Sequence, residues 1–270
     1  MQLLSDLLSI KTGVTSIIGS GGKTTMLSTL ARELASKGER VILTTSTHMF
    51  PFDSYPTLTD SSPAWKEESS KFPELKPTQL DSLLEKHKVI TVGCLDRKTG
   101  KLSTPTCGFS QLSNYADYVL VEADGSKRLP LKLHRKSEPV IPKESHQTIL
   151  LVGASGFGKP FGKVCHHPEL LSTLSIFDSE SNIDECSYVN DICNIDKHMY
   201  KASSSYANLI STPELTARCI LAEGLTHTVF LNQIDLFSED NKEDILKRFS
   251  DALGYPFYAG SLKRGFWTRC

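Results

Sequence analysis

A glycine-rich stretch near the amino end carries the residues best suited to phosphate chemistry. The segment "SIIGSGGKTT" (16–25) places a lysine and two threonines directly after two glycines. Backbone N–H groups of such a loop can surround phosphate oxygens, the lysine adds a positive charge, and the next hydroxyl can bind Mg²⁺. The common pattern G-x-x-x-x-G-K-[ST] would need a glycine at position 17, where this chain has Ile17.

We interpret the stretch as a shortened phosphate loop that binds Mg²⁺ with ATP or GTP. A strand predicted at 14–18 precedes it, and a helix predicted at 23–37 begins at the lysine, which favours this reading over a glycine turn that simply ends a strand. "IIGSGGKTT" also resembles the shortened mononucleotide loop of the Mur-ligase type. We expect Lys23 to be exposed in the empty loop and to act in catalysis. The predicted nucleotide contacts are Gly19, Ser20, Gly21, Gly22, Lys23, Thr24 and Thr25.

Two carboxylates end the apolar run "YVLVEADGS" (118–126). Glu122 and Asp124 are two residues apart, so on a strand they share one face. Beside a phosphate loop they are candidates for Mg²⁺ binding together with Thr24, or for a division into a metal ligand and a catalytic base. The alternative is a solvated strand end.

A second strand ends in "TTSTH" (44–48), whose polar side chains would lie at the same edge of a parallel sheet. Thr45, Thr47 and His48 are candidates for contact with phosphate, Mg²⁺ or a substrate. Hydroxyls at such positions serve equally well as caps of a following helix.

The stretch "FLNQID" (230–235) resembles the Asn-Lys-x-Asp element that reads guanine in GTPases. Asn232 would brace neighbouring loops, and Asp235 would accept hydrogen bonds from the guanine ring. Gln233 replaces the usual lysine, and "GSLKR" (260–264) could complete the base pocket. The alternative is an ordinary turn at the end of a strand.

The segment after Asp124 is strongly basic and predicts a second site for an anionic substrate. A solvated basic loop is the alternative. "CHHPE" (165–169) offers metal-binding residue types, but adjacent residues do not easily converge on one ion, so contact with a substrate or a loop before a helix at 167–174 is favoured. The candidate substrate contacts of these two segments are Arg128, Lys132, His134, Glu138, His166 and His167.

Short apolar runs alternate with helical patterns along the chain, which predicts an α/β fold of the P-loop NTPase type, with a mostly parallel sheet and helices on both faces. Leu3, Leu4, Leu7 and Leu8 predict an amphipathic first helix. We interpret residues 1–270 as one domain, with a surface excursion at 51–78 and a helical insertion at 175–208. The predicted strands are 14–18, 40–45, 88–93, 117–123, 147–153 and 227–232, and the predicted helices are 23–37, 79–87, 213–223 and 239–253.

The composition argues against nucleic acid and membranes as partners and indicates reduced cysteines. The 270 residues carry a formal net charge of −1, which gives no global basic field for a nucleic-acid partner. No apolar run approaches the roughly 20 residues that span a bilayer, so no membrane partner is expected. The seven cysteines are odd in number and widely spaced, as is typical of reduced thiols in a cytoplasmic protein.

Four blocks of the chain resemble the YqeC-type selenium-dependent molybdenum hydroxylase accessory proteins, also called selenium cofactor biosynthesis proteins. They are "IIGSGGKTT", "VILTTSTHMF", "VLVEADGSKRLPLKLHRKSEPVIP" and "LVGASGFGKPFGKVCHHPELL". The chain departs from the family at Gln233, where lysine is common, and at His167, where arginine is usual. The resemblance implies a P-loop fold and a role in maturing selenium-containing molybdenum enzymes, with a selenium or molybdenum cofactor species or a client hydroxylase as partner.

The sequence is compatible with more than one class of reaction. We expect an NTPase that hydrolyses the nucleotide or transfers a phosphoryl group. The first rival is a Mur-ligase-like or kinase-like enzyme that activates an anionic small molecule. The second is a non-catalytic chaperone gated by nucleotide.

Overall fold

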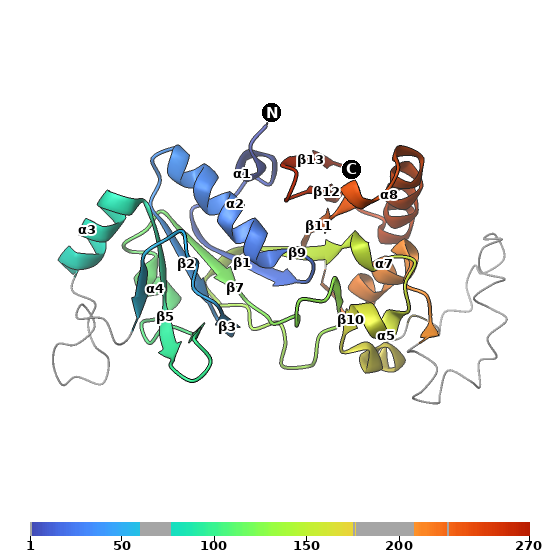
Figure 1. Cartoon of the computed structure of the whole chain (residues 1–270), viewed down its shortest axis with the longest axis horizontal. Coiled ribbons are helices and arrows are strands. Elements are labelled where there is room, and N and C mark those ends of the chain that lie inside the picture. Colours follow the sequence, from blue (N-terminus) through green and yellow to red (C-terminus); the bar gives the residue numbers. More distant parts are fainter. Residues whose placement is uncertain (1, 60–76, 175, 177–207, 226) are drawn as a thin grey trace.

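A mixed but mostly parallel β-sheet forms the body of the protein (Figure 1). The computed structural model describes residues 2–59, 77–174, 176, 208–225 and 227–270. The strands follow the spatial order β13-β12-β11-β9-β1-β7-β2-β5-β6-β3, and β4 pairs with β5. In chain order they are β1 (Gly13–Gly19), β2 (Val41–Thr45), β3 (His48–Met49), β4 (Thr57–Thr59), β5 (Val89–Asp96), β6 (Lys101–Ser103), β7 (Tyr118–Glu122), β9 (Ser145–Gly153), β11 (Thr228–Asn232), β12 (Tyr258–Ser261) and β13 (Phe266–Arg269).

The centre of the sheet is parallel, and it contains all six strands predicted from apolar runs. From β12 through β11, β9, β1, β7 and β2 to β5, each neighbouring pair is parallel. Strands β13, β6 and β3 add antiparallel pairs at the two margins. Because parallel strands end at the same edge, the segments that follow β1, β2, β7, β9 and β11 emerge together, and ligands of open α/β sheets bind at such an edge.

Alternate residues of the central strands face two separate apolar layers. Ile17 and Leu120 pack in one layer with α1 (Leu4–Leu7) and α2 (Lys23–Ser36). Ile18 and Val119 pack in the other with residues of the remaining helices. These are α3 (Pro77–His87), α4 (Phe109–Leu112), α5 (Phe161–Val164), α7 (Pro213–Ala222) and α8 (Glu239–Leu253). The predicted α/β fold with a mostly parallel sheet and helices on both faces is confirmed.

Helix α2 presents the apolar stripe that its sequence predicts. Its core-facing residues are fully or almost fully buried: Leu27, Leu30, Ala31 and Leu34. On the same helix, the Glu33 carboxylate accepts hydrogen bonds from the backbone N–H groups of Leu4 (3.0 Å) and Ser5 (2.7 Å). These bonds satisfy N–H groups at the start of α1, so the short first helix is fixed against α2. The predicted amphipathic first helix is confirmed.

Several smaller expectations have different outcomes. Within the predicted excursion at 51–78, Thr57–Thr59 forms β4 and pairs in parallel with β5, whereas 60–76 lies outside the described residues. Most of the predicted helical insertion at 175–208 also lies outside them. The expected helix at 167–174 is a 3₁₀ helix, Pro168–Thr173. No helix in the described part of the chain is long and apolar enough to cross a membrane.

Candidate functional site

The glycine-rich loop connects β1 to α2 at the carboxyl edge of the sheet. Gly19, Gly21 and Gly22 all have left-handed backbone conformations, with φ of +84°, +85° and +137°. A β-carbon at Gly21 would lie 2.4 Å from the Gly153 Cα, so any side chain there would collide with the backbone of β9. Glycine at Gly22, before α2, leaves the first helical N–H groups without a side-chain cap. The loop is therefore tight and lies directly before a helix N-terminus, a position that can bind an anion.

Lys23 is the first residue of α2, and its ammonium lies inside the site. The side chain is almost fully buried, in contrast to the predicted exposed side chain. Its Nζ is 2.9 Å from the Asp124 Oδ1 and donates hydrogen bonds to the Gly19 carbonyl (2.6 Å) and the Ser126 hydroxyl (3.2 Å). The prediction of an exposed lysine is wrong because the neighbouring strand supplies a buried carboxylate, which holds the ammonium back against the loop.

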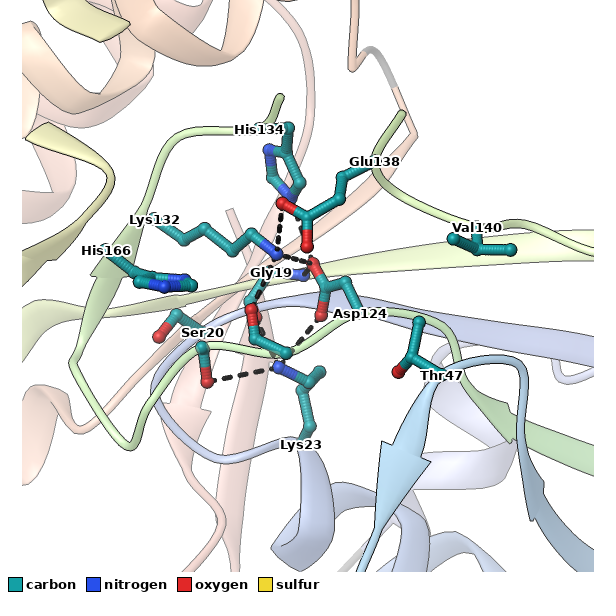
Figure 2. A network of polar contacts seen from close by, with 12 residues as sticks. Gly19, Ser20, Lys23, Thr47, Asp124, Lys132, His134, Glu138, Val140 and His166 are labelled. Atoms are coloured by element: carbon teal, nitrogen blue, oxygen red, sulfur yellow. Dashed lines mark hydrogen bonds and ion pairs between the residues drawn. The ribbon is translucent and has the colours of Figure 1, made fainter. Parts of the chain in front are cut away.

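Asp124 is the centre of a buried ionic network (Figure 2). Its Oδ2 accepts a hydrogen bond from the Gly19 N–H (2.8 Å) and lies 3.0 Å from the His134 Nε2 and 3.4 Å from the Lys132 Nζ. Its Oδ1 makes the ion pair with Lys23. Burial by itself would raise the pKa of this carboxyl. Lys23, the hydrogen bond with His134 and Lys132 together hold the pKa well below its usual range.

Lys132, the second ammonium beside Asp124, has a further carboxylate partner. The Lys132 side chain is fully buried; its Nζ lies 3.1 Å from the Glu138 Oε2 and donates to the Gly125 carbonyl at 2.6 Å. These contacts leave the ammonium no exposed surface for a substrate in this state. The sequence grouped Lys132 and Glu138 as substrate contacts, and the structure brings both together around Asp124 instead.

His134 lies between two carboxylates. On one side is Asp124, and on the other is Glu223, just after the last residue of α7. The Glu223 Oε1 accepts the His134 backbone N–H at 2.5 Å, and its Oε2 lies 3.1 Å from the ring Nδ1. Burial would lower the pKa of His134, but the hydrogen bonds with Asp124 and Glu223 raise it above its ordinary value. The imidazole is therefore favoured as a cation, and three carboxylates face three basic groups in one network.

Glu122 ends β7 beside this network. In the parallel pairing of β1 with β7, Glu122 lies opposite Ile17, two residues before the start of the glycine-rich loop at Gly19. Burial raises the pKa of Glu122 to about 7, and nearby Lys23 only partly opposes this effect. A carboxyl group with such a pKa can accept or give a proton near neutral pH. Asp124 and Glu122 thus differ in their proton affinity although they share one strand end.

The polar residues after β2 form a turn at the same edge. The Thr45 hydroxyl donates to the Glu122 carbonyl (2.8 Å) and accepts the Thr47 N–H (3.0 Å). The predicted alternative of a helix cap is wrong, because the short strand β3 follows. Thr47 is partly exposed on this turn, and His48 is exposed on β3.

Asn232 joins two loops at the end of β11, as the sequence predicts. Its Nδ2 donates to the Gly21 carbonyl (2.7 Å), and its Oδ1 accepts the Leu262 N–H (3.0 Å). One amide therefore ties the glycine-rich loop to the segment after β12. Since β11 lies two strands from β1, this contact fixes the relative position of the loop and the predicted base pocket.

Asp235 lies on a 3₁₀ turn, Ile234–Leu236, beside the loop at 260–264. Its carboxylate is mostly buried, and its Oδ2 lies 3.8 Å from the Arg264 Nε. Gln233 has a left-handed backbone (φ +70°), and its Oε1 accepts a hydrogen bond from the Ser155 hydroxyl at 2.6 Å. The glutamine that replaces the usual lysine is therefore engaged by the segment after β9.

The remaining candidates lie around a tight turn and a short second sheet. Arg128 is exposed in the turn at 126–129. Strand β10 (Cys165–His166) pairs in parallel with β8 (Leu131–Lys132), which places His166 next to Lys132. His167 follows in a left-handed conformation, and its Nδ1 lies 3.0 Å from the Glu169 carboxylate. Among the described residues, no group of three or more His, Cys, Asp or Glu side chains is placed to hold a metal.

The first turn of α2 leaves Thr24 and Thr25 exposed, whereas Ser20 is buried and its hydroxyl donates to the Leu129 carbonyl.

Two residues of the network around Asp124 were not predicted. Ser126 gave no signal beyond its place after Asp124. Glu223 lies in "LAEGL", where nothing in the spacing distinguishes it from a surface glutamate at the end of a helix.

The comparisons with known proteins agree with the sequence blocks around this site. A family model described as "YqeC protein" matches residues 15–169. The "Uncharacterized protein YqeC" of Escherichia coli (strain K12) is 31% identical over 163 residues, which cover 54% of this chain and 53% of that protein. The chain thus matches about half the length of this curated relative. No solved structure matches the chain. Because the family model covers more than half of the residues, the chain belongs to the YqeC protein family.

Proposed function

We propose that this protein binds Mg²⁺–NTP at loop 19–25 and hydrolyses the nucleotide or transfers its terminal phosphoryl group, as an accessory protein in the maturation of selenium-dependent molybdenum hydroxylases. One observation carries the proposal: Lys23, at the start of a helix after a three-glycine loop, forms a buried ion pair with Asp124. An anion-binding loop, a lysine and a carboxylate at the next strand tip are the parts that nucleotide hydrolysis requires. The family resemblance supports the role in maturation.

The donor set fits Mg²⁺, which prefers hard oxygen ligands. The Thr24 hydroxyl is exposed at the first turn of α2, and Asp124 offers carboxylate oxygens, which leaves Glu122 free to act as a base. The Asp124 Oδ1 makes no hydrogen bond and is held by the Lys23 ammonium alone. If Lys23 contacted the phosphates instead, this oxygen would be free to bind the metal. A bound Mg²⁺ would neutralise phosphate charge.

The protein's own groups would act as follows. Lys23 and the N–H groups of the loop would stabilise charge that develops on the terminal phosphoryl group, usually a large catalytic effect. Glu122, with a pKa of about 7, would accept the proton of the attacking hydroxyl or water. Such a base favours proton-coupled transfer over a purely nucleotide-gated chaperone. A kinase-like or ligase-like reaction with an anionic acceptor is therefore the second candidate.

We infer that the nucleotide is GTP rather than ATP. Asn232 connects the phosphate loop to the segment after β12, and Asp235 lies at the same rim with a mostly buried carboxylate. A carboxylate at this position can accept two hydrogen bonds from the guanine N–H groups, which adenine does not offer.

The test of the reaction is release of phosphate from Mg²⁺–GTP by wild type and by Glu122→Gln. We expect kcat/KM of wild type to rise with pH and to level off above about 7, because this parameter reports the free enzyme and the Glu122 pKa is about 7. Glu122→Gln should bind nucleotide normally and lose both turnover and this pH dependence. Normal turnover by the variant would contradict Glu122 as the base. Loss of hydroxylase maturation in cells that carry Lys23→Ala would support the accessory role.

A further inference from the structure

His166 has an unusual environment for a histidine. Its residue is about nine-tenths buried, and neither ring nitrogen makes a hydrogen bond within the described structure. Buried polar groups without a partner are rare, and each calls for an explanation such as a missing ligand. The Gly125 carbonyl lies near the ring and accepts a hydrogen bond from the Lys132 ammonium at 2.6 Å. The ring of His167 lies against that of His166, with the centroids 3.8 Å apart and the ring planes tilted by 34°.

A basic turn at 126–129 comes just before β8, the strand that pairs with the strand of His166. The Leu129 N–H donates to the Ser126 carbonyl at 3.0 Å, and the two central residues, Lys127 and Arg128, have φ of +48° and +62°. Positive φ at both central positions defines a type I′ turn, which normally takes glycine, asparagine or aspartate. Here it carries two exposed cations. Strained backbone of this kind concentrates at functional sites.

The turn is attached directly to the phosphate loop. On one side of it, Ser126 accepts a hydrogen bond from Lys23; on the other, the Leu129 carbonyl accepts one from the Ser20 hydroxyl. Next to it, the Pro130 carbonyl accepts the Gly153 N–H at 2.9 Å. The backbone of the turn that carries the two cations is therefore fixed beside the loop that would carry the nucleotide phosphates.

The local charge favours an anion. Burial lowers the pKa of His166, and His167, Lys132 and Lys127 lower it further, against a smaller opposing effect of the Gly125 backbone. No ion pair with Lys127 or Arg128 occurs in the described part of the chain, whereas Lys132 is already neutralised by Asp124 and Glu138. A neutral imidazole with both nitrogens unpaired can donate one hydrogen bond and accept another.

We propose that the His166–His167 pair and the Lys127–Arg128 turn form a second anion-binding site beside the phosphate loop, for a small substrate that carries a phosphate-type oxyanion. The turn cations would bind the oxyanion, and the His166 ring would orient it. That this site holds the acceptor of a phosphoryl group rests on the proposed function; the binding of the anion itself does not.

The ring nitrogens of His166 provide a local readout. Nitrogen-15 spectra of the histidine rings, with His166 assigned from His166→Gln, are recorded while inorganic phosphate is added at constant ionic strength. We expect a saturable shift of the His166 signals, with chloride alone giving none. The shift should persist when Mg²⁺–GTP saturates the phosphate loop. A shift that does not saturate, or that disappears with nucleotide bound, would overturn the proposal.

Two double variants separate specific binding from general charge. Lys127→Ala/Arg128→Ala should weaken phosphate binding at least about tenfold, because charge-assisted hydrogen bonds are lost. The control, Lys136→Ala/Lys143→Ala, removes the same charge from exposed positions and should leave binding unchanged. Equal weakening by both would contradict a built site. Competition between inorganic phosphate and methyl phosphate identifies the free or the esterified oxyanion as the preferred ligand, and binding of neither would refute the site.

Nucleotide binding, measured on the same samples by calorimetry, keeps the two proposals distinct. A saturable response of His166 to phosphate without any nucleotide binding would refute the proposed function and leave the anion site intact. Nucleotide binding without a response of His166 to phosphate would refute the anion site and leave the proposed function intact.

Discussion

At the scale of single residues, the site is defined by the ion pairs between its basic groups and its carboxylates. Lys23 and Lys132 both contact Asp124, one on each carboxylate oxygen, and His134 shares the second oxygen. Buried ion pairs contribute little net stability compared with apolar groups, but removing one partner leaves the other charge poorly compensated. The phosphate-loop lysine is therefore both a candidate ligand group and a structural cation.

Replacement of Lys23 by alanine should destabilise the folded protein. Asp124 would keep Lys132 and His134, so we expect the free energy of unfolding to fall by about 1–3 kcal/mol, less than for a fully isolated buried charge. Urea unfolding at neutral pH measures the effect. Lys37→Ala is the matched control, because Lys37 follows the same helix and makes an exposed ion pair with Asp6; it should cost no more than about 1 kcal/mol. Equal stability of Lys23→Ala and wild type would contradict the buried pair.

At the scale of elements, the strand ends could be predicted better than the contacts between them. Apolar runs and their polar ends located the six central strands, and a parallel sheet then required Lys23, Glu122 and Asn232 to meet at one edge. The sequence did not reveal that the side chains of Lys132 and His134 are buried. A basic segment shows the same residue pattern whether its charges are solvated or paired with carboxylates. The partner that draws His134 inward, Glu223, lies 89 residues away in sequence.

The proposed recognition of guanine depends on two elements, β11 and the segment after β12. Asp235→Asn should reduce the preference for GTP over ATP, because the carboxylate that matches two guanine donors is replaced by an amide. The expected loss in GTP affinity is roughly 1–3 kcal/mol, with ATP affinity nearly unchanged. Competition binding measures both. Asp240→Asn, an exposed change in the first turn of α8, is the control. If the ratio of GTP affinity to ATP affinity is unaltered in Asp235→Asn, "FLNQID" is only a strand-end turn.

At the scale of the whole molecule, the network links the part matched by the family model to the part beyond it. Residues 15–169 contain the loop, both strand-tip carboxylates and the basic segment. Glu223 and Asn232 come from outside this range and support the site from α7 and β11. The matched half therefore depends on the second half of the chain for the geometry of the site.

Glu223→Gln tests this dependence through its pH profile. His134 has a raised pKa in the folded state, so its contribution to stability is complete below the unfolded value near 6.5 and is lost as pH rises through the folded pKa. The stability difference between wild type and Glu223→Gln should therefore be largest near pH 6 and shrink towards pH 9. Glu214→Gln removes an ion pair with Arg248 on the same helix and should show a constant difference. A constant difference for Glu223→Gln as well would contradict a clamped imidazolium.

The central claim is that the loop at 19–25 binds a nucleotide through Lys23. Calorimetric titration of Mg²⁺–GTP into wild type, Lys37→Ala and Lys23→Ala, all well below their melting temperatures, tests it directly. We expect one nucleotide to bind wild type and Lys37→Ala with equal affinity, and Lys23→Ala to bind at least about tenfold more weakly, because a charged hydrogen bond to phosphate is lost. Equal affinities for all three proteins, or no binding of Mg²⁺–GTP or Mg²⁺–ATP to wild type, would contradict the account.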